Sequence, residues 1–339
     1  MIELTANELL VFSFPELHED AQCSVNFQRT LRIPDDNREY PLPPGLGAFP
    51  MEHVEDHQPR LPASWSEHQG VLLPMYQAEA LWISFNCRSG YPFAIKIAAG
   101  QINAVTGDPW TNAFTKKPQD YVVAPDQPWL DGFCVQKGLI RQFVAMPLGE
   151  GYTAEEQLTG LAEHGGLQVI VYPMKRERYE KLRKDREKTR VHSLDLCLSA
   201  AKDSCEENCE SSMGLAPGGL MRQEIYDDHY GHDAWDLSRS SRCFVHILNS
   251  TQWTAATGKD CPGQPPSAAD YTKAGLPWFA YYNDNARVLN GAAVLAGLAS
   301  VAAKSVELGG APLPGGEAIA KPMVVKLGLT AGGVAEGTW

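Results

Sequence analysis

The chain has 339 residues, 44% of them hydrophobic, so it is long enough to bury one large core or two modest ones. Its formal net charge of −12 repels phosphate backbones and acidic membrane surfaces, which argues against general nucleic-acid binding. The longest weakly polar stretch, residues 291–303, is well short of the roughly 20 apolar residues that a membrane-spanning helix needs. We therefore expect a soluble protein with neither nucleic acid nor membrane as a partner.

The N-terminus and the cysteines bear on the cellular compartment. The first residues, MIELTANELLVFSFPELHED, carry acids where a secretory signal needs positive charge, and no small-residue cleavage site follows. The 8 cysteines of such a chain are expected to be reduced thiols. These features predict a cytoplasmic protein.

Glycine and proline divide the first half of the chain into short segments rich in β-branched and aromatic residues. Residues 24–33 alternate between polar and apolar and end at the turn-forming run PDDN, which predicts a strand. Residues 40–62 contain six prolines, so we expect them to be extended, either wrapping the surface or linking elements. Between residues 71 and 172 each apolar run is bounded by Gly, Pro, Asn or Asp, as strands of an antiparallel sheet are.

Helices are predicted in the middle of the chain. Thr153 and Glu156 form a capping box, and Gly165-Gly166 is expected to end the helix before a strand over 167–172. The run KRERYEKLRKDREKTR, residues 175–190, has nine basic and four acidic residues. It predicts an exposed helix that is either a basic arm for an acidic partner or a solvated face with i,i+4 ion pairs. Helix-compatible spacing continues to residue 210, and the glycine-rich run 211–221 is predicted to be a connection before a strand over 241–248.

These patterns together predict a β-rich α+β protein with a mainly antiparallel sheet, either a sandwich or a barrel, and a few peripheral helices. Residues 1–70 are expected to supply an N-terminal strand and proline-rich segment that pack on the core. Residues 71–308 form the main domain and end in an Ala-rich helix over 289–308. Residues 309–339 are a Gly/Pro-rich tail with a possible strand over 323–329, and we expect the tail to be mobile.

The densest group of metal-capable side chains is the run YDDHYGHDAWD, residues 226–236. His229 and His232, with Asp228 or Asp233, supply imidazoles and carboxylates at short spacing, and His246 is the natural third histidine for a divalent metal. Without metal, Asp228, His229 and Asp233 could transfer protons. The other interpretations are an acidic turn and, for His246, a histidine satisfied in the core.

Tryptophans recur beside polar groups, at Trp110, Trp129 and Trp235. Trp129 lies two residues before Asp131, and an indole next to a carboxylate is suited to hold a sugar ring. We therefore predict a ligand-binding set of Trp110, Trp129, Asp131 and Trp235, with core packing as the alternative.

Three cysteines, Cys197, Cys205 and Cys209, would fall within about 120° of one another on a continuous helix at about 100° per residue. With Cys243 or Cys261 they could complete a thiolate site, although cysteine also behaves as a small core hydrophobe. The chain has no dinucleotide fingerprint, P-loop, nucleophile elbow or C-x-x-C motif.

The leading interpretation is a β-rich binding or assembly protein, whose partner is either a small polar, carbohydrate-like ligand or other copies of the chain. The N-terminal arm and C-terminal tail suggest the assembly role. The alternative is a metal-assisted or acid–base enzyme centred on Asp228, His229, His232 and Asp233.

Overall fold

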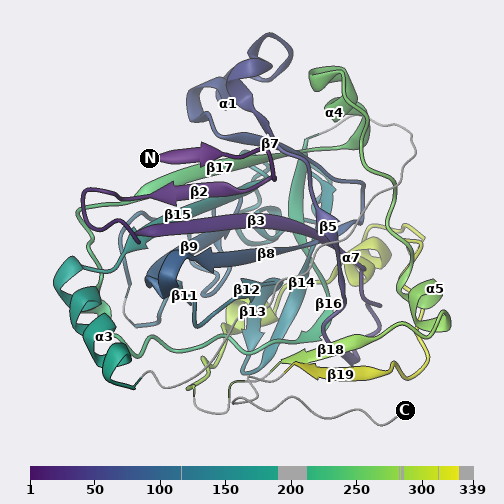
Figure 1. Cartoon of the computed structure of the whole chain (residues 1–339). Helices are drawn as coiled ribbons and strands as arrows, with labels where there is room; N and C mark the ends of the chain where they lie inside the picture. Colours follow the sequence, from purple (N-terminus) through teal and green to yellow (C-terminus); the bar gives the residue numbers. More distant parts are fainter. Residues whose placement is uncertain (116, 190–211, 282, 284–285, 312, 328–339) are drawn as a thin grey trace, which may run out of the picture.

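A computed structural model of the chain shows a β-rich molecule with short helices at its edges (Figure 1). It describes all residues except 116, 190–211, 282, 284–285, 312 and 328–339. The strands are β1 (Ile2–Leu4), β2 (Leu10–Ser13), β3 (Gln22–Thr30), β4 (Glu39–Tyr40), β5 (Gly45–Ala48), β6 (Glu52–His53), β7 (Val71–Pro74), β8 (Ala80–Cys87), β9 (Phe93–Ala99), β10 (Ile102–Asn103), β11 (Val122–Ala124), β12 (Trp129–Leu130), β13 (Gly132–Gln136), β14 (Leu139–Pro147), β15 (Leu167–Pro173), β16 (Met213–Arg222), β17 (Ser241–Leu248), β18 (Trp278–Tyr281) and β19 (Val324–Leu327). The helices are α1 (Ala63–His68), α2 (Ala154–Thr159), α3 (Arg176–Thr189), α4 (Ser250–Thr257), α5 (Ala268–Lys273), α6 (Ala293–Ala296) and α7 (Val301–Glu307).

Backbone pairing joins β1 to β17 into one sheet in the described part of the chain, and β18 pairs with β19 in a second. The pairs are antiparallel except β4 with β16, β7 with β17 and β18 with β19. The prediction of a β-rich α+β protein with a mainly antiparallel sheet is confirmed. No described helix has the length and apolar character that crossing a bilayer requires.

The core lies between two runs of paired strands. One run is β2, β3, β8, β14 and β16, and the other is β9, β15 and β17. A single buried cluster takes Phe27 and Ile83 from the first run and Ile97 and Val169 from the second. Because both runs contribute inward side chains to the same cluster, they share one core.

The glycine-rich run near residue 215 is a ten-residue strand, β16, and its predicted role as a connection was wrong. A methyl group on Gly218 would lie 2.6 Å from Val144 Cγ2, and one on Gly219 would lie 2.3 Å from the Pro34 carbonyl oxygen. Neither glycine has a positive φ. These glycines therefore permit close approach of neighbouring chain segments rather than a turn.

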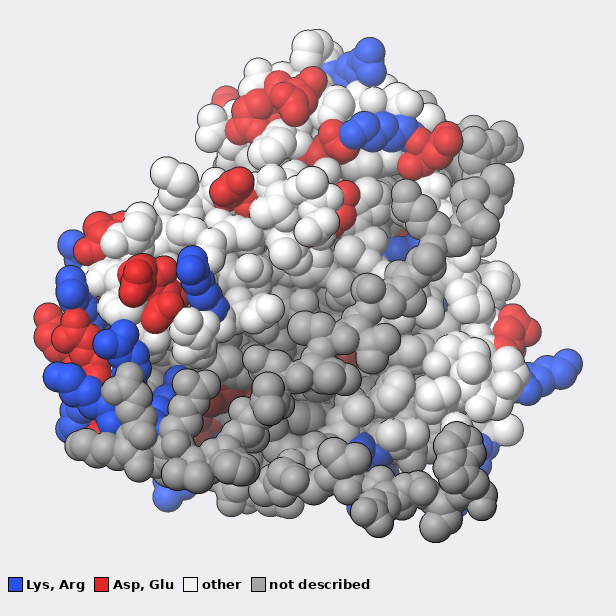
Figure 2. All heavy atoms as spheres, in the orientation of Figure 1, with Lys and Arg blue, Asp and Glu red and all other residues white. Residues whose placement is uncertain are grey.

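The helices differ from prediction mainly at their ends. Thr153 caps α2 with the expected capping box, but Gly160, at φ 73°, ends the helix before Gly165-Gly166. Helix α3 is exposed, and Figure 2 shows acidic and basic side chains interspersed at the edge where it lies; Arg176 pairs with Glu180 across one turn. The Ala-rich segment forms two helices, α6 and α7, because Ser300 caps a new helix after Gly297.

Candidate ligand-binding pocket

The acidic run 226–236 is a loop that Asp228 holds in place. The Asp228 carboxylate accepts hydrogen bonds from the Tyr121 hydroxyl at 2.7 Å, from Trp235 Nε1 at 2.9 Å and from two backbone N–H groups of its own loop. Tyr121 and Trp235 are almost completely buried. Four donors satisfy both oxygens, so Asp228 stabilises the loop against the core.

The other polar residues of this loop lie apart from one another. The side chain of His229 is 62% exposed and has its Nδ1 3.6 Å from Asp126, and Asp233 is exposed and pairs with Arg178. The ring of His232 contacts Phe114 edge-on at 5.7 Å.

His246 lies in the core, where its ring stacks on Trp65 at 4.4 Å and Nε2 lies 3.0 Å from the Gln69 carbonyl oxygen. Burial lowers its pKa to about 4, so the ring is neutral at pH 7. The described residues contain no group of three or more His, Cys, Asp or Glu side chains that could hold a metal ion. His229, His232 and His246 are thus not brought together as ligands in this structure.

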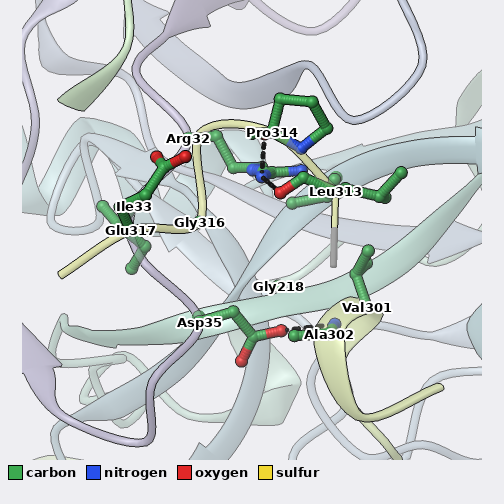
Figure 3. A pocket seen from close by; sticks show the side chains of 12 residues that line it. Arg32, Ile33, Asp35, Gly218, Val301, Ala302, Leu313, Pro314, Gly316 and Glu317 are labelled. Atoms are coloured by element: carbon green, nitrogen blue, oxygen red, sulfur yellow. Dashed lines mark hydrogen bonds between the residues drawn. The ribbon is translucent and has the colours of Figure 1, made fainter. Parts of the chain in front are cut away.

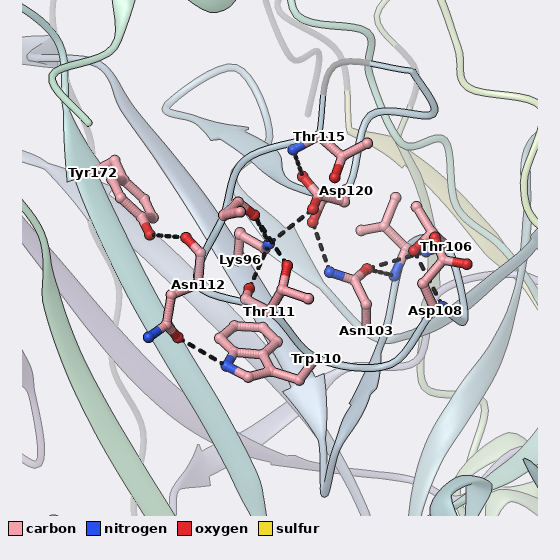
Figure 4. Close-up of polar contacts among 12 residues, drawn as sticks. Lys96, Asn103, Thr106, Asp108, Trp110, Thr111, Asn112, Thr115, Asp120 and Tyr172 are labelled. Carbon is pink, nitrogen blue, oxygen red and sulfur yellow. Dashed lines mark hydrogen bonds and ion pairs between the residues drawn. The ribbon is translucent and has the colours of Figure 1, made fainter. Parts of the chain in front are cut away.

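Two of the predicted ligand-binding tryptophans stabilise the fold. Trp235 is buried and donates to Asp228, as described above. Trp110 lies with its ring 5.2 Å from the ammonium of Lys96, which is itself buried and 2.7 Å from Asp120 (Figure 4). Lys96 also donates to the carbonyls of Thr111 and Ala113. All three of its donors have partners, which makes this network a clamp on the 104–120 segment.

The other two, Trp129 and Asp131, line one pocket. Its volume is about 210 Å³, and its walls are mostly apolar: Leu42, Pro43, Pro44, Gly45, Trp82, Trp129, Asp131, Phe279 and Leu327. Residues 42–45 belong to the proline-rich segment, while Phe279 and Leu327 come from the separate β18–β19 sheet. Leu42 and Phe279 exchange two backbone hydrogen bonds of 2.8 Å, so these two walls are fastened to each other.

Trp82 is the wall residue that the sequence analysis did not identify. On β8, Leu81, Ile83 and Phe85 point into the core, whereas Trp82 and Ser84 alternate onto the opposite face and are only half-buried. Trp129 pairs with Ser84, so its indole is the diagonal neighbour of Trp82, with ring centroids 6.0 Å apart at 72°. A large aromatic residue on the outer face of a strand was the signal that could have found it.

Trp82 also has an unsatisfied donor. Its Nε1 is buried and has no hydrogen-bond partner among the described residues. A methyl group added at Gly45 would lie 3.3 Å from Trp82 Cζ2, so the glycine keeps this side of the pocket open. A buried donor without a partner costs about 1–3 kcal/mol.

Asp131 is a buried acid that has no cationic partner in the part of the chain that the structure describes. It is 4% exposed, its Oδ1 accepts from Gln223 Nε2 at 3.2 Å, and its backbone N–H donates to Gln223 Oε1 at 3.0 Å. Burial raises the pKa of Asp131 to about 8, and the hydrogen bond from Gln223 opposes this only in part. Two other buried acids, Asp120 and Glu79, are paired with Lys96 and Arg29. Asp131 therefore lacks the compensation that the fold provides for these acids.

Another cavity, of about 340 Å³, lies beside the Gly/Pro-rich segment 313–317 (Figure 3). Two of its charged groups, Arg32 and Asp35, have partners within the chain. Arg32 donates to the carbonyls of Leu313 and Pro314, and Asp35 accepts from the Ala302 N–H at 2.8 Å. These contacts fasten residues 313–317 and α7 to the sheet, which is a structural role.

The cysteines of the predicted thiolate site fall into two groups. Cys197, Cys205 and Cys209 lie outside the described residues. Cys243 and Cys261 are buried free thiols, and burial raises the pKa of both, to about 12 and about 11.

Comparison with known proteins yields no relative: no protein-family model, curated protein or solved structure matches this chain.

Proposed function

We propose that this chain is a binding protein whose site for a small molecule is the pocket between Trp82 and Trp129. The observation that carries the proposal is an unpaired buried carboxyl, Asp131, in a pocket whose other side chains are mostly apolar. Functional sites collect groups that the fold alone would not favour, and a concave apolar pocket with few polar groups is the usual form of a ligand site.

Three features support a bound ligand rather than a packing defect. Two indoles at 72° offer a flat and an edge-on surface to a ring or methyl-rich body. Trp82 lines the pocket, and its buried Nε1 has no hydrogen-bond partner among the described residues. The walls come from segments far apart in the sequence that are tied together by backbone hydrogen bonds, which preorganises the pocket.

The test is a ligand-observed NMR screen of a small-fragment library against three proteins: wild type, Trp129→Leu and Trp110→Leu. Both tryptophans are half-buried, but only Trp129 lines the pocket, so Trp110→Leu is a matched control for the loss of an indole. We expect fragments that bind the wild type to be lost in Trp129→Leu and retained in Trp110→Leu. No binding to the wild type, or equal binding to all three folded proteins, would overturn the proposal.

A further inference from the structure

We infer that the ligand of this pocket is an organic cation, a protonated amine on an apolar body, rather than a sugar. This inference rests on the proposed function, because it specifies what the same pocket binds. It replaces the carbohydrate-like ligand that the tryptophan pattern suggested.

The pocket offers few polar groups to a ligand. Among the side chains that line the pocket, only Asp131, Trp82 and Trp129 carry polar atoms, and Pro43 and Pro44 have no backbone N–H. A sugar presents several hydroxyl groups, each of which needs a partner when it leaves water. One carboxyl and two indole N–H groups are too few to satisfy them all. A ligand with one strongly polar group and an apolar remainder fits this lining.

Asp131 favours a positive charge on the polar group of the ligand. Asp131 is the only ionisable side chain in the lining, and its ionised form lacks a cation within the described residues. Basic side chains on neighbouring strands have other surroundings: Arg141 on β14 donates to the Gly218 carbonyl, Arg222 on β16 pairs with Glu39, and Lys326 on β19 is exposed. An ammonium group would supply the missing charge in a charge-assisted hydrogen bond.

The aromatic rings of the pocket and the net charge of the protein also favour a cation. The indoles of Trp82 and Trp129 and the ring of Phe279 line the same pocket, and the negative faces of aromatic rings attract cations. The formal charge of −12 also favours the approach of cations from solution. At pH 7 the acid is mostly protonated, because its pKa is about 8, so binding of an ammonium ion would displace the carboxyl proton into solvent.

The test uses two probes of nearly the same shape, benzylamine and benzyl alcohol, titrated calorimetrically at pH 8.5 into wild type and Asp131→Asn. At this pH Asp131 is mostly ionised and the amine mostly protonated. We expect the wild type to bind benzylamine about tenfold or more tightly than benzyl alcohol, and Asp131→Asn to lose this preference while still binding the alcohol. Retained alcohol binding is also the control that the variant pocket is intact.

The outcomes separate the two proposals. Equal affinity for amine and alcohol in the wild type, unchanged in Asp131→Asn, would overturn the cation inference and leave the binding pocket standing. Equal loss of both probes in Trp129→Leu would then show that the probes occupy this pocket. No binding of either probe to the wild type, together with a negative fragment screen, would overturn both proposals.

Discussion

Replacing Asp131 with asparagine should stabilise the protein at neutral pH. The variant keeps the shape of the side chain and an oxygen that can accept from Gln223 Nε2, but it has no charge to bury. The pKa of Asp131 is raised in the folded state, so the folded protein binds more protons than the unfolded chain between about pH 4 and pH 8. The contribution of Asp131 to the free energy of unfolding is therefore fully present below about pH 4 and is lost as the pH rises from about 4 to about 8.

The magnitude follows from the shift. Between an unfolded pKa of about 3.9 and a folded pKa of about 8, each pH unit costs about 1.36 kcal/mol. The penalty that the variant removes is about 1.5 kcal/mol at pH 5 and about 4 kcal/mol at pH 7, as an upper bound. Urea denaturation at pH 5, 7 and 8.5 measures this penalty as the difference in the free energy of unfolding between Asp131→Asn and the wild type, which should grow with pH.

Asp120→Asn is the matched control. Asp120 is 5% exposed, close to the 4% of Asp131, but it is paired with Lys96 at 2.7 Å. Removing one partner of a buried ion pair leaves the other charge uncompensated and costs about 3–5 kcal/mol. We expect opposite signs for the two variants at pH 7. If Asp131→Asn is destabilised as much as Asp120→Asn, or if its pH dependence matches the wild type, the reasoning about an unpaired acid is refuted.

Three further predictions concern the rest of the fold. The pKa of His246 is lowered from 6.5 to about 4, so the free energy of unfolding should fall by up to about 3 kcal/mol as the pH falls from 6.5 to 4. Urea denaturation of His246→Gln should show a smaller loss of stability over this pH range than the wild type. The same pH dependence in both proteins would contradict the prediction. Gly132→Ala places a methyl group 2.0 Å from the Arg141 carbonyl oxygen, so this variant should have a severely lowered melting temperature. In the control Gly297→Ala the nearest atom to the methyl group is 3.5 Å away, so the melting temperature should change by only a few degrees. Equal melting temperatures of the two variants would refute this prediction. Elemental analysis should find the same metal content in wild type and in the His229→Ala/His232→Ala variant, and one equivalent lost in the variant would restore the metal interpretation of the acidic loop.

Local sequence patterns were sufficient where short-range physics decides the structure. The capping box at Thr153 and Glu156 predicted the start of α2, because the two side chains satisfy backbone donors three residues away. The buried run 167–172 predicted β15, which lies between β9 and β17 with every residue buried. A short, mostly apolar run of this length that is bounded by turn residues is typical of a buried strand.

Patterns were insufficient where a residue's role depends on distant partners. The glycines of β16 look like turn residues, and only the packing of Val144 and Pro34 against them explains why a strand needs them. The acidic loop looks like a metal site, but Tyr121, from a distant part of the chain, and Trp235 of the same loop both donate to the Asp228 carboxylate, which is a structural acceptor.

The sequence by itself determined the fold class, since the alternation of apolar residues and the spacing of turn residues act over a few residues and dictate strands and caps. It also placed Trp129 close to Asp131, and these are two of the nine residues that line the pocket. Only the tertiary structure decided that Trp82 lies next to Trp129, that prolines and a separate small sheet form the other walls, and that no cationic side chain of the described residues pairs with Asp131. Burial and charge compensation depend on which segments meet in space, and that information is not local to any stretch of the chain.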